Sequence, residues 1–378
     1  MIGALIMHRS TASSSIRPRP SASSSGTRAP GTSAAPGSTS AGATSAPAAL
    51  VVSAISPATG TTNVPGSEPI SVSFSTPLAQ DTPTPTLSPA TPGSWEVSGD
   101  VLRFAPSTDF TPLSTVTLTI PGGTNGVVAA DGAHLAQAVS EQFRIEDGSI
   151  LRLQQLLSIL DYSPLAWTPA SGAIAPSDTA AQAGALFTPP AGAFAWRNGG
   201  WPAQLRALWE PGRYDVLTKG LVMSFEADHG LNPNGHLGPA LWHALTVALA
   251  QHTVNTGGYN YALANKTAPE TLTVYHDGRV VLQTTANTGI AQSPTPDGTF
   301  PVFTRLRSQV MRGTNPDGQH YADLVQYVAY FHGNDAVHYM DRADYGIPQS
   351  LGCIELPLTA AARAWPYLAY GTLVTVVN

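Results

Sequence analysis

The sequence has little charge, a single cysteine and no long hydrophobic run. Charged residues make up 11% of the 378 residues, which argues against a coiled coil, a helical repeat array or a nucleic-acid-binding protein. No apolar stretch approaches the length of a membrane-spanning helix, so no integral membrane span is predicted. The one cysteine, Cys353, excludes an intramolecular disulfide and a cysteine-based zinc finger. This thiol is therefore either a small buried apolar side chain or a nucleophile.

The net charge of −6 is unevenly distributed along the chain. Residues 1–50 contain four arginines and no acidic residue, which leaves 14 basic against 24 acidic residues in the remainder. A body of this charge repels a phosphate backbone, so nucleic acid is not an expected partner. The apolar start at residues 1–7 has no basic segment before it, which makes it a poor signal peptide.

Composition divides the chain into a tether and a folded body. Of the forty residues in 10–49, thirty-six are Ser, Thr, Ala, Gly or Pro. Such a segment buries too little apolar surface to offset the loss of chain entropy, so residues 1–49 are predicted to be a disordered tether. The rest is predicted to be a multidomain, mainly β protein.

Short alternating runs separated by turn residues fill residues 50–147. Examples are Ile70–Phe74, Val101–Phe104 and Val116–Ile120, and the runs of this region are bounded by turn sequences such as Ser98-Gly99-Asp100 and Asp131-Gly132. Six or seven strands at this spacing predict a β-sandwich. The opening phrase around Pro57 and Pro65 resembles bacterial Ig-like modules, and the absence of a His, acid and nucleophile set favours a spacer.

Helical periodicity begins at Ser149 and defines a third region, residues 148–252. Apolar side chains recur at helical spacing over four segments: 150–160, 203–209, 216–225 and 239–249. A Pro/Ala/Gly-rich insertion at 168–195 interrupts them. The flanking phrases resemble the small three-helix peptidoglycan-binding domain, so a helical domain of that type is predicted here.

Three histidines in this region lie seven residues apart: His229, His236 and His243. With Gly and Pro between them, this spacing does not place them on one helix face, and no Asp/Glu-rich ligand set accompanies them. No metal site is predicted.

Residues 270–378 read as a nearly all-β domain that carries the chemistry. A strand, an Asp-Gly turn and a second strand occupy 271–281, further β-type runs lie at 302–303, 324–331 and 371–377, and one short helix is expected at 359–365. The densest polar feature is a His-rich segment from His332 to His338, followed by Ser350-Leu351-Gly352-Cys353.

A cysteine nucleophile needs a base and backbone donors for the developing oxyanion. His338 is the first candidate for the base, and His332 is the reserve. Ser350 is placed to orient either partner. Gly352 allows a sharp turn and a close approach of substrate, and the amides of Gly352 and Cys353 are candidate oxyanion donors. No cofactor is required by this chemistry.

The pattern resembles the L,D-transpeptidase catalytic domain, the YkuD family, whose signature is a His upstream of Ser/Thr-His-Gly-Cys. The family's upstream His falls on His338, its Ser/Thr on Ser350, its Gly on Gly352 and its nucleophile on Cys353. Segments 274–278 and 287–302 also look like the family.

The sequence departs from the signature at two positions. Leu351 stands where the motif has its own His, and Glu355 stands where many members have Arg or Asn. The first removes whatever positioning that His gives the thiol, and the second leaves the handling of substrate carboxylates unassigned. An inactive relative is the corresponding alternative.

The resemblance implies a cysteine acyltransferase that acts on peptidoglycan stem peptides through a thioester on Cys353 and forms 3→3 cross-links. Carbapenem-type β-lactams are the implied inhibitors, and a secreted or cell-envelope location is implied. Tyr330, Arg342 and Tyr345 flank the loop between His338 and Cys353 and are candidate substrate-binding residues. Two alternatives stay open: an L,D-carboxypeptidase with water as acceptor, and a non-catalytic wall-binding protein.

Overall fold

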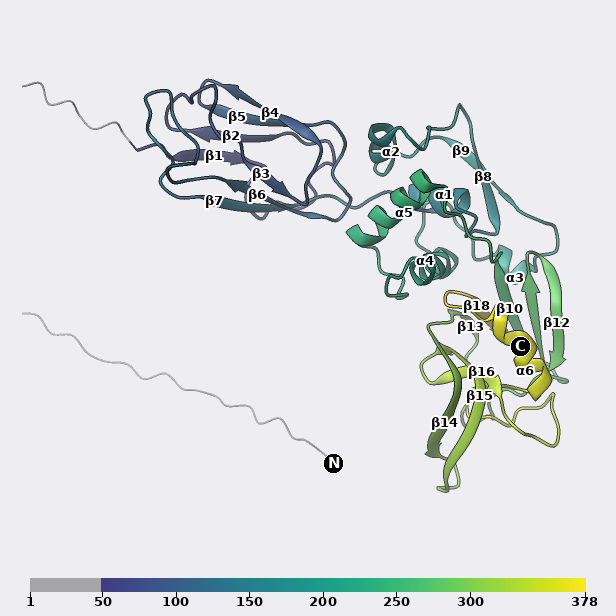
Figure 1. The fold of residues 1–378 in the computed structure, drawn as a ribbon. Helices are drawn as coiled ribbons and strands as arrows, with labels where there is room; N and C mark the ends of the chain where they lie inside the picture. The colour runs from purple at the N-terminus through teal and green to yellow at the C-terminus, as the bar shows by residue number, and fades with distance from the viewer. Residues whose placement is uncertain (1–48) are drawn as a thin grey trace, which may run out of the picture. The chain divides into compact units, whose positions relative to one another are not determined.

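The structure is a computed structural model that describes residues 49–378, coloured along the chain in Figure 1. Residues 1–48, which hold nearly all of the expected tether, lie outside the described residues. No described helix is long and apolar enough to cross a membrane.

The first folded part is a sandwich of two antiparallel sheets, which face one another in Figure 1. One sheet has the order β1-β2-β5-β4 and the other the order β3-β6-β7. The strands are β1 (Val52–Ser56), β2 (Ile70–Phe74), β3 (Thr86–Ser88), β4 (Gly93–Ser98), β5 (Val101–Pro106), β6 (Thr115–Ile120) and β7 (Val139–Arg144). The predicted sandwich is confirmed, although β3 was not among the predicted runs because three residues show no usable alternation.

Alternation along each strand builds the core of this sandwich. In β2, the side chains of Ile70, Val72 and Phe74 are buried and those between them are more exposed. Leu118 of β6 is fully buried and belongs to the same apolar cluster. The sandwich therefore follows the period-two pattern expected for sheets with one buried and one solvated face.

The second part is mainly helical. Its elements are α1 (Ile150–Ile159), β8 (Leu165–Pro169), α2 (Thr179–Ala185), β9 (Gly192–Trp196), α3 (Ala203–Arg206), α4 (Val216–Asp228) and α5 (Pro239–Gln251). The insertion predicted as an interruption at 168–195 is in fact ordered structure, because β8 and β9 pair as an antiparallel hairpin with α2 between them. The peptidoglycan-binding character of this region stays a prediction.

Side-chain caps and a shared core hold these helices. The Ser149 and Asp215 side chains accept hydrogen bonds from the third residue of α1 and α4, at 3.4 and 2.6 Å. The core cluster of this region also includes Tyr261 and Leu373, which belong to strands of the following domain. The helical region and the C-terminal domain thus share one apolar core.

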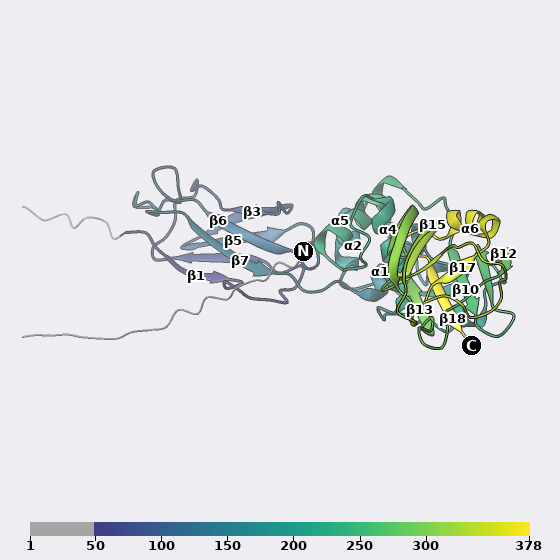
Figure 2. The same cartoon turned by 90° about the horizontal axis from the view of Figure 1, so that it is seen from below.

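The C-terminal domain contains two sheets. The first has the order β12-β11-β10-β18-β13, and Figure 2 shows β10, β18 and β13 side by side. Its strands are β10 (Asn260–Asn265), β11 (Thr271–His276), β12 (Arg279–Thr285), β13 (Gly298–Pro301) and β18 (Leu373–Val377). The expected domain start at residue 270 is too late, because β10 is the central strand of this sheet. Its parallel partner, β18, lies at the far end of the chain, a pairing that local sequence does not reveal.

The second sheet carries the candidate site and has the order β14-β15-β16-β17. Its strands are β14 (Thr304–Thr314), β15 (His320–His332), β16 (Asp335–Tyr339) and β17 (Ile354–Leu356). A β-bulge interrupts the pairing of β15 with β16, where Tyr327 has a φ of 59°. The predicted helix is α6 (Leu358–Ala364), followed by a 3₁₀ turn.

Candidate active site

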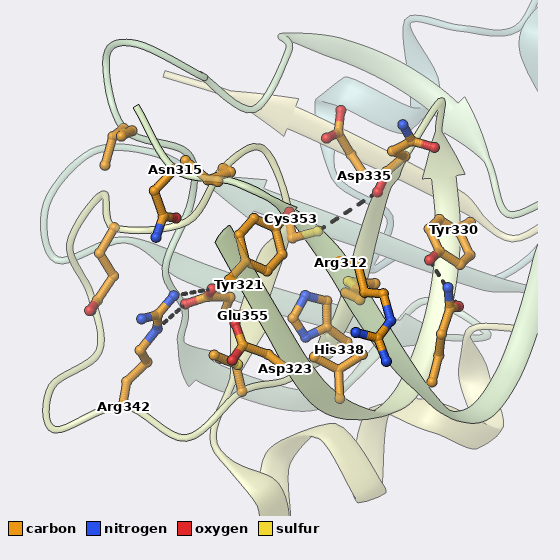
Figure 3. A pocket seen from close by; sticks show the side chains of 18 of the residues that line it. Arg312, Asn315, Tyr321, Asp323, Tyr330, Asp335, His338, Arg342, Cys353 and Glu355 are labelled. Carbon is orange, nitrogen blue, oxygen red and sulfur yellow. Dashed lines mark hydrogen bonds and ion pairs between the residues drawn. The ribbon is translucent and has the colours of Figure 1, made fainter. Parts of the chain in front are cut away.

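The short parallel pair of β16 and β17 brings the predicted base and nucleophile to one face of the sheet. Val337 is paired with Ile354 and His338 with Glu355. Cys353 directly precedes β17, two residues before Glu355, so the alternation of side chains places it on the same face as His338. Figure 3 shows the His338 ring and the Cys353 thiol in the same pocket.

The turn before β17 is held by side-chain hydrogen bonds. The Ser350 hydroxyl, which is buried, donates to the Cys353 carbonyl at 2.6 Å and accepts from the Gly352 amide at 3.2 Å. The Thr295 hydroxyl donates to the Gly352 carbonyl at 2.8 Å. These contacts fix the backbone that presents the thiol. The predicted orienting role of Ser350 fits this position.

Gly352 occupies a position that only glycine fits. Its φ is +114°, and a Cβ there would collide with Oδ1 of Asp335. The Gly352 amide already donates to Ser350, so its predicted part in an oxyanion hole requires that this bond be exchanged for one to substrate. The Cys353 amide remains the second predicted donor.

The environment of Cys353 keeps its thiol protonated at rest. Burial raises the pKa of Cys353 to about 12, a backbone hydrogen bond from Ala336 lowers it, and the nearby charges of Asp335 and Glu355 raise it. The thiol donates a weak hydrogen bond to the Asn334 carbonyl, with Sγ and the oxygen 3.9 Å apart. Attack by this sulfur therefore needs a base at the moment of reaction.

His338 is suited to be that base. Its Nδ1 lies 3.0 Å from the Tyr339 carbonyl, and because a carbonyl only accepts, Nδ1 carries the proton. Nε2 then holds a free lone pair. Burial lowers the pKa of His338, and the hydrogen bond to Tyr339 and the charge of Glu355 partly oppose this. The resting pair is thus a neutral imidazole and a neutral thiol.

Glu355 and Arg342 form a two-pronged ion pair beside this dyad. The Arg342 Nε and Nη2 atoms lie 2.8 and 2.6 Å from the two carboxylate oxygens of Glu355. Glu355 is buried, and the Asn287 amide also approaches it, at 3.4 Å. The hydrogen bond to Glu355 raises the pKa of Arg342. The negative charge that Glu355 brings to this position is therefore neutralised by Arg342, which lies in the loop after β16.

A cavity of about 420 Å³ opens over the thiol. Of the three predicted substrate-binding residues, Tyr330 and Arg342 line it and Tyr345 does not. The Tyr345 hydroxyl instead donates to the Met340 carbonyl at 2.5 Å, a hydrogen bond within the loop that follows β16. The Tyr330 hydroxyl donates to Gln309 at 3.0 Å. Burial raises the pKa of Tyr330, and the hydrogen bond to Gln309 partly opposes this.

The reserve base, His332, is outside this cavity. It ends β15, and its side chain is 47% exposed and hydrogen-bonded to Asp335 at 3.1 Å. Of the two histidines, only His338 lines the cavity with Cys353.

Sequence reasoning missed several cavity residues. They are Gln309, Met311, Arg312, Tyr321, Asp323 and Asp335. Most lie on the β14–β15 hairpin, whose long strands were not fully predicted. The sequence signal was weak, because residues 309–313 and 321–325 do not alternate regularly between polar and apolar side chains.

Among the described residues there is no group of three or more His, Cys, Asp or Glu side chains able to hold a metal ion. In the helical region, His229 stacks on Phe225 with ring centroids 4.1 Å apart.

A buried imidazole and a cysteine thiol that line one cavity, beside a glycine turn, are the groups that thiol-dependent acyl transfer requires. Residues 259–376 match the L,D-transpeptidase catalytic domain, YkuD, and residues 46–145 match the bacterial Ig-like domain, Big_5. The chain therefore carries both domains and is an enzyme of the L,D-transpeptidase class.

Solved L,D-transpeptidases resemble the chain at low TM-scores. The Mycobacterium smegmatis enzyme is 15% identical, over 88% of this chain and 100% of its own, with a TM-score of 0.30. L,D-transpeptidase 3 from Mycobacterium tuberculosis, in complex with a faropenem-derived adduct, is 16% identical over 86% and 98%, with a TM-score of 0.29. The E. faecium catalytic domain, acylated by ertapenem, is 28% identical over 32% and 98%, with a TM-score of 0.29. No curated protein matches the chain. The assignment rests on the domain matches.

Proposed function

We propose that the protein cross-links peptidoglycan stem peptides through a thioester on Cys353, with His338 as the general base and acid. The observation that carries this proposal is the placement of both side chains on one face of the β16–β17 pair, within one cavity. The match of residues 259–376 to the transpeptidase domain supplies the substrate class.

In the first half-reaction, His338 Nε2 takes the thiol proton as Sγ attacks the carbonyl of the third residue of a donor tetrapeptide stem. The amides of Cys353 and Gly352 stabilise the oxyanion, and Ser350 keeps the turn in place. The imidazolium then returns its proton to the departing amine, so terminal D-alanine leaves and a thioester remains. A neutral resting pair suits this sequence, because the proton moves only when substrate is present.

In the second half-reaction, the side-chain amine of a neighbouring stem attacks the thioester and forms the 3→3 cross-link. Water in place of the amine makes the same site an L,D-carboxypeptidase. The cavity walls carry charged groups of both signs, including Arg312 and Asp323, which suits peptide substrates with free carboxylates and amines.

The location and partners follow from this substrate. We place the protein outside the cytoplasm, in or near the cell envelope, with the Ig-like domain as a spacer and residues 148–252 as a wall-binding part. Carbapenem-type β-lactams are expected to acylate Cys353, as acylation is described for the E. faecium catalytic domain.

The test is Cys353→Ala, assayed on a disaccharide-tetrapeptide with the mass of every product measured. The wild type is expected to release D-alanine and form a cross-linked dimer, and the variant neither. A carbapenem is expected to add its mass to the wild type alone. D-alanine release by the variant at the wild-type rate would overturn the proposal, and a monomeric tripeptide as the sole product would favour the carboxypeptidase.

The non-catalytic alternative is tested on the full chain, because the helical core includes Tyr261 and Leu373 of the catalytic domain. Isolated sacculi are mixed with the Cys353→Ala protein. Retention of the variant, together with no product from the wild type, would support a wall-binding protein.

A further inference from the structure

A second acid–base pair lies beside Cys353 and has no part in the steps above. His332 ends β15 and Asp335 begins β16, on either side of the hairpin turn. Their side chains are joined by a hydrogen bond of 3.1 Å between Nδ1 and Oδ2. The Asp335 side chain is 18% exposed and lines the cavity, whereas that of His332 is 47% exposed and lies outside it. The hydrogen-bonded pair therefore extends from the cavity to the solvent.

The position of Asp335 is tightly defined. Its Oδ1 lies so close to Gly352 that any side chain there would collide with it. Figure 3 shows Asp335 and His338 on opposite sides of Cys353. The charge of Asp335 raises the pKa of the thiol, so this carboxylate opposes the first half-reaction. A group that opposes acylation but is built into the nucleophile's turn suggests a role in the other half-reaction.

The other half-reaction has a need that His338 alone does not meet. The acceptor is a primary amine, which is an ammonium ion at neutral pH, with a pKa near that of lysine, about 10. It must be bound as a cation and must lose a proton before its nitrogen has a lone pair for attack. A carboxylate next to the thioester, with an outlet to solvent, meets both needs.

We propose that Asp335 is the acceptor-side catalytic residue, which binds the incoming ammonium and removes its proton, with His332 as the residue that holds the carboxylate in place on its solvent side. This inference rests on the proposed acyl transfer and adds the residue that selects amine over water.

One proton passes from the ammonium to Asp335, which releases it to solvent, while the His332 Nδ1 donates a hydrogen bond to the same carboxylate. The amine nitrogen attacks the thioester carbonyl, which forms a C–N bond and a tetrahedral intermediate. The second nitrogen proton goes to His338 Nε2, and the C–S bond breaks with the electron pair on sulfur. The imidazolium then returns that proton to Cys353, so an amide, a free thiol and one released proton result.

The experiment forms the acyl-enzyme from a tetrapeptide stem and divides it between water and an acceptor stem at neutral pH. Asp335→Asn keeps the shape of the side chain and is expected to lower the ratio of transfer to hydrolysis by about 100-fold, the usual scale for a lost general base. His332→Gln is expected to lower it by about tenfold, since Asp335 keeps its contact with the amine. The matched control is Asp341→Asn, an exposed carboxylate outside the cavity, with an unchanged ratio.

A second acceptor separates catalysis from a structural effect. Hydroxylamine is neutral at this pH and needs no base, so it is expected to intercept the Asp335→Asn acyl-enzyme as well as the wild-type one. An equal transfer ratio for the stem amine in Asp335→Asn and wild type would overturn the inference, and so would an equal loss with hydroxylamine. A wild type that forms no acyl-enzyme would overturn the proposed function itself, which is a different readout.

Discussion

The Ig-like and catalytic domains are both built from β-sheets, yet they bury different kinds of side chain. In the Ig-like part, the buried polar side chains are Thr82 and Ser114. In the catalytic part they are Glu270, Asn287, Thr288, Thr295, His338, Ser350, Glu355, Thr372 and Thr375. Because a buried polar group costs free energy unless it is hydrogen-bonded, the catalytic domain has to supply a partner for each of these groups.

These partners link the first catalytic sheet to the site. Glu270 accepts hydrogen bonds from the Thr288 amide and hydroxyl at 2.6 and 2.8 Å. Asn287 forms a bridge with Glu355, and the adjacent Thr288 carbonyl accepts from the Ser350 amide at 2.9 Å. The segment that resembles the family around 287–295 therefore acts as a polar frame for the cysteine turn. The described residues of the Ig-like sandwich contain no comparable frame, since only Thr82 and Ser114 are buried polar side chains there.

The largest expected effect comes from Gly352→Ala, compared with Gly132→Ala in the Ig-like part. Both glycines have positive φ, but a Cβ at 352 meets Asp335 whereas one at 132 meets nothing within 4 Å. Gly352→Ala should displace the thiol and slow carbapenem acylation by about 100-fold or more. Gly132→Ala should cost only the backbone strain, about 1 kcal/mol of unfolding free energy.

Acylation is followed by intact-protein mass, and stability by thermal unfolding. An active Gly352→Ala protein would mean that the turn has room to relax, and that the polar frame is less rigid than the contacts indicate.

How far the sequence predicts this molecule depends on whether the signal is local. Apolar and polar side chains alternate clearly along the Ig-like strands, so these strands are predictable from local sequence. The candidate set His338, Ser350, Gly352 and Cys353 is also local, because its members lie within sixteen residues of one another. The central strand β10 was missed, because its parallel partner β18 is at the end of the chain. The hairpin at 165–196 was hidden by its Pro, Ala and Gly content, which resembles a loop.

The charged part of the site was predictable only in pieces. Glu355 stood out as a departure from the family, and Arg342 as a residue near the motif, but their pairing depends on how the loop after β16 folds back. The exclusion of Tyr345 from the cavity has the same origin, since its hydroxyl turns toward Met340. Loop geometry of this kind leaves no periodic trace in sequence.

The second prediction concerns Glu355→Gln. It leaves the Arg342 charge uncompensated near His338, which disfavours the imidazolium and weakens the base, and we expect this loss to exceed the gain from removing a charge that raises the pKa of Cys353. Acylation should slow about tenfold, equivalent to one pKa unit on His338, and the unfolding free energy should fall by about 2 kcal/mol, since Arg342 is partly exposed.

The double variant Arg342→Gln/Glu355→Gln is the control for this prediction. Removing both charges should recover most of the rate, as expected for a coupled pair. If the activation free energies lost in the two single variants simply add in the double variant, the pair does not act through its charge.

The matched polar bond in the Ig-like part is the hydrogen bond from the Val128 amide to the Thr82 hydroxyl, at 2.8 Å. Thr82→Val should lower the unfolding free energy by about 1 kcal/mol and leave the acylation rate unchanged.

The third prediction concerns pH. Only neutral His338 accepts the thiol proton, and burial lowers its pKa from the ordinary 6.5. As pH falls, the imidazole should therefore stay neutral through 6.5, and the acid limb of acylation kcat/KM should lie below that value. Glu355 raises this pKa and Arg342 lowers it, so Glu355→Gln should move the limb further toward acid. An acid limb above pH 6.5 would contradict a buried, neutral base.

The smallest expected effect on acylation comes from Leu118→Ala, compared with Leu356→Ala. Both side chains are fully buried, one in β6 of the Ig-like sandwich and the other in β17, three residues after Cys353. Each deletion should cost about 2–5 kcal/mol of unfolding free energy, because a cavity is left in a packed core. Leu118→Ala should leave the acylation rate within about twofold of wild type, since its cluster contains none of the cysteine's polar frame. Leu356→Ala should slow acylation, because β17 sets the register of Glu355 opposite His338. Equal losses of acylation in the two variants would show that the Ig-like sandwich supports the site as much as the catalytic sheet does.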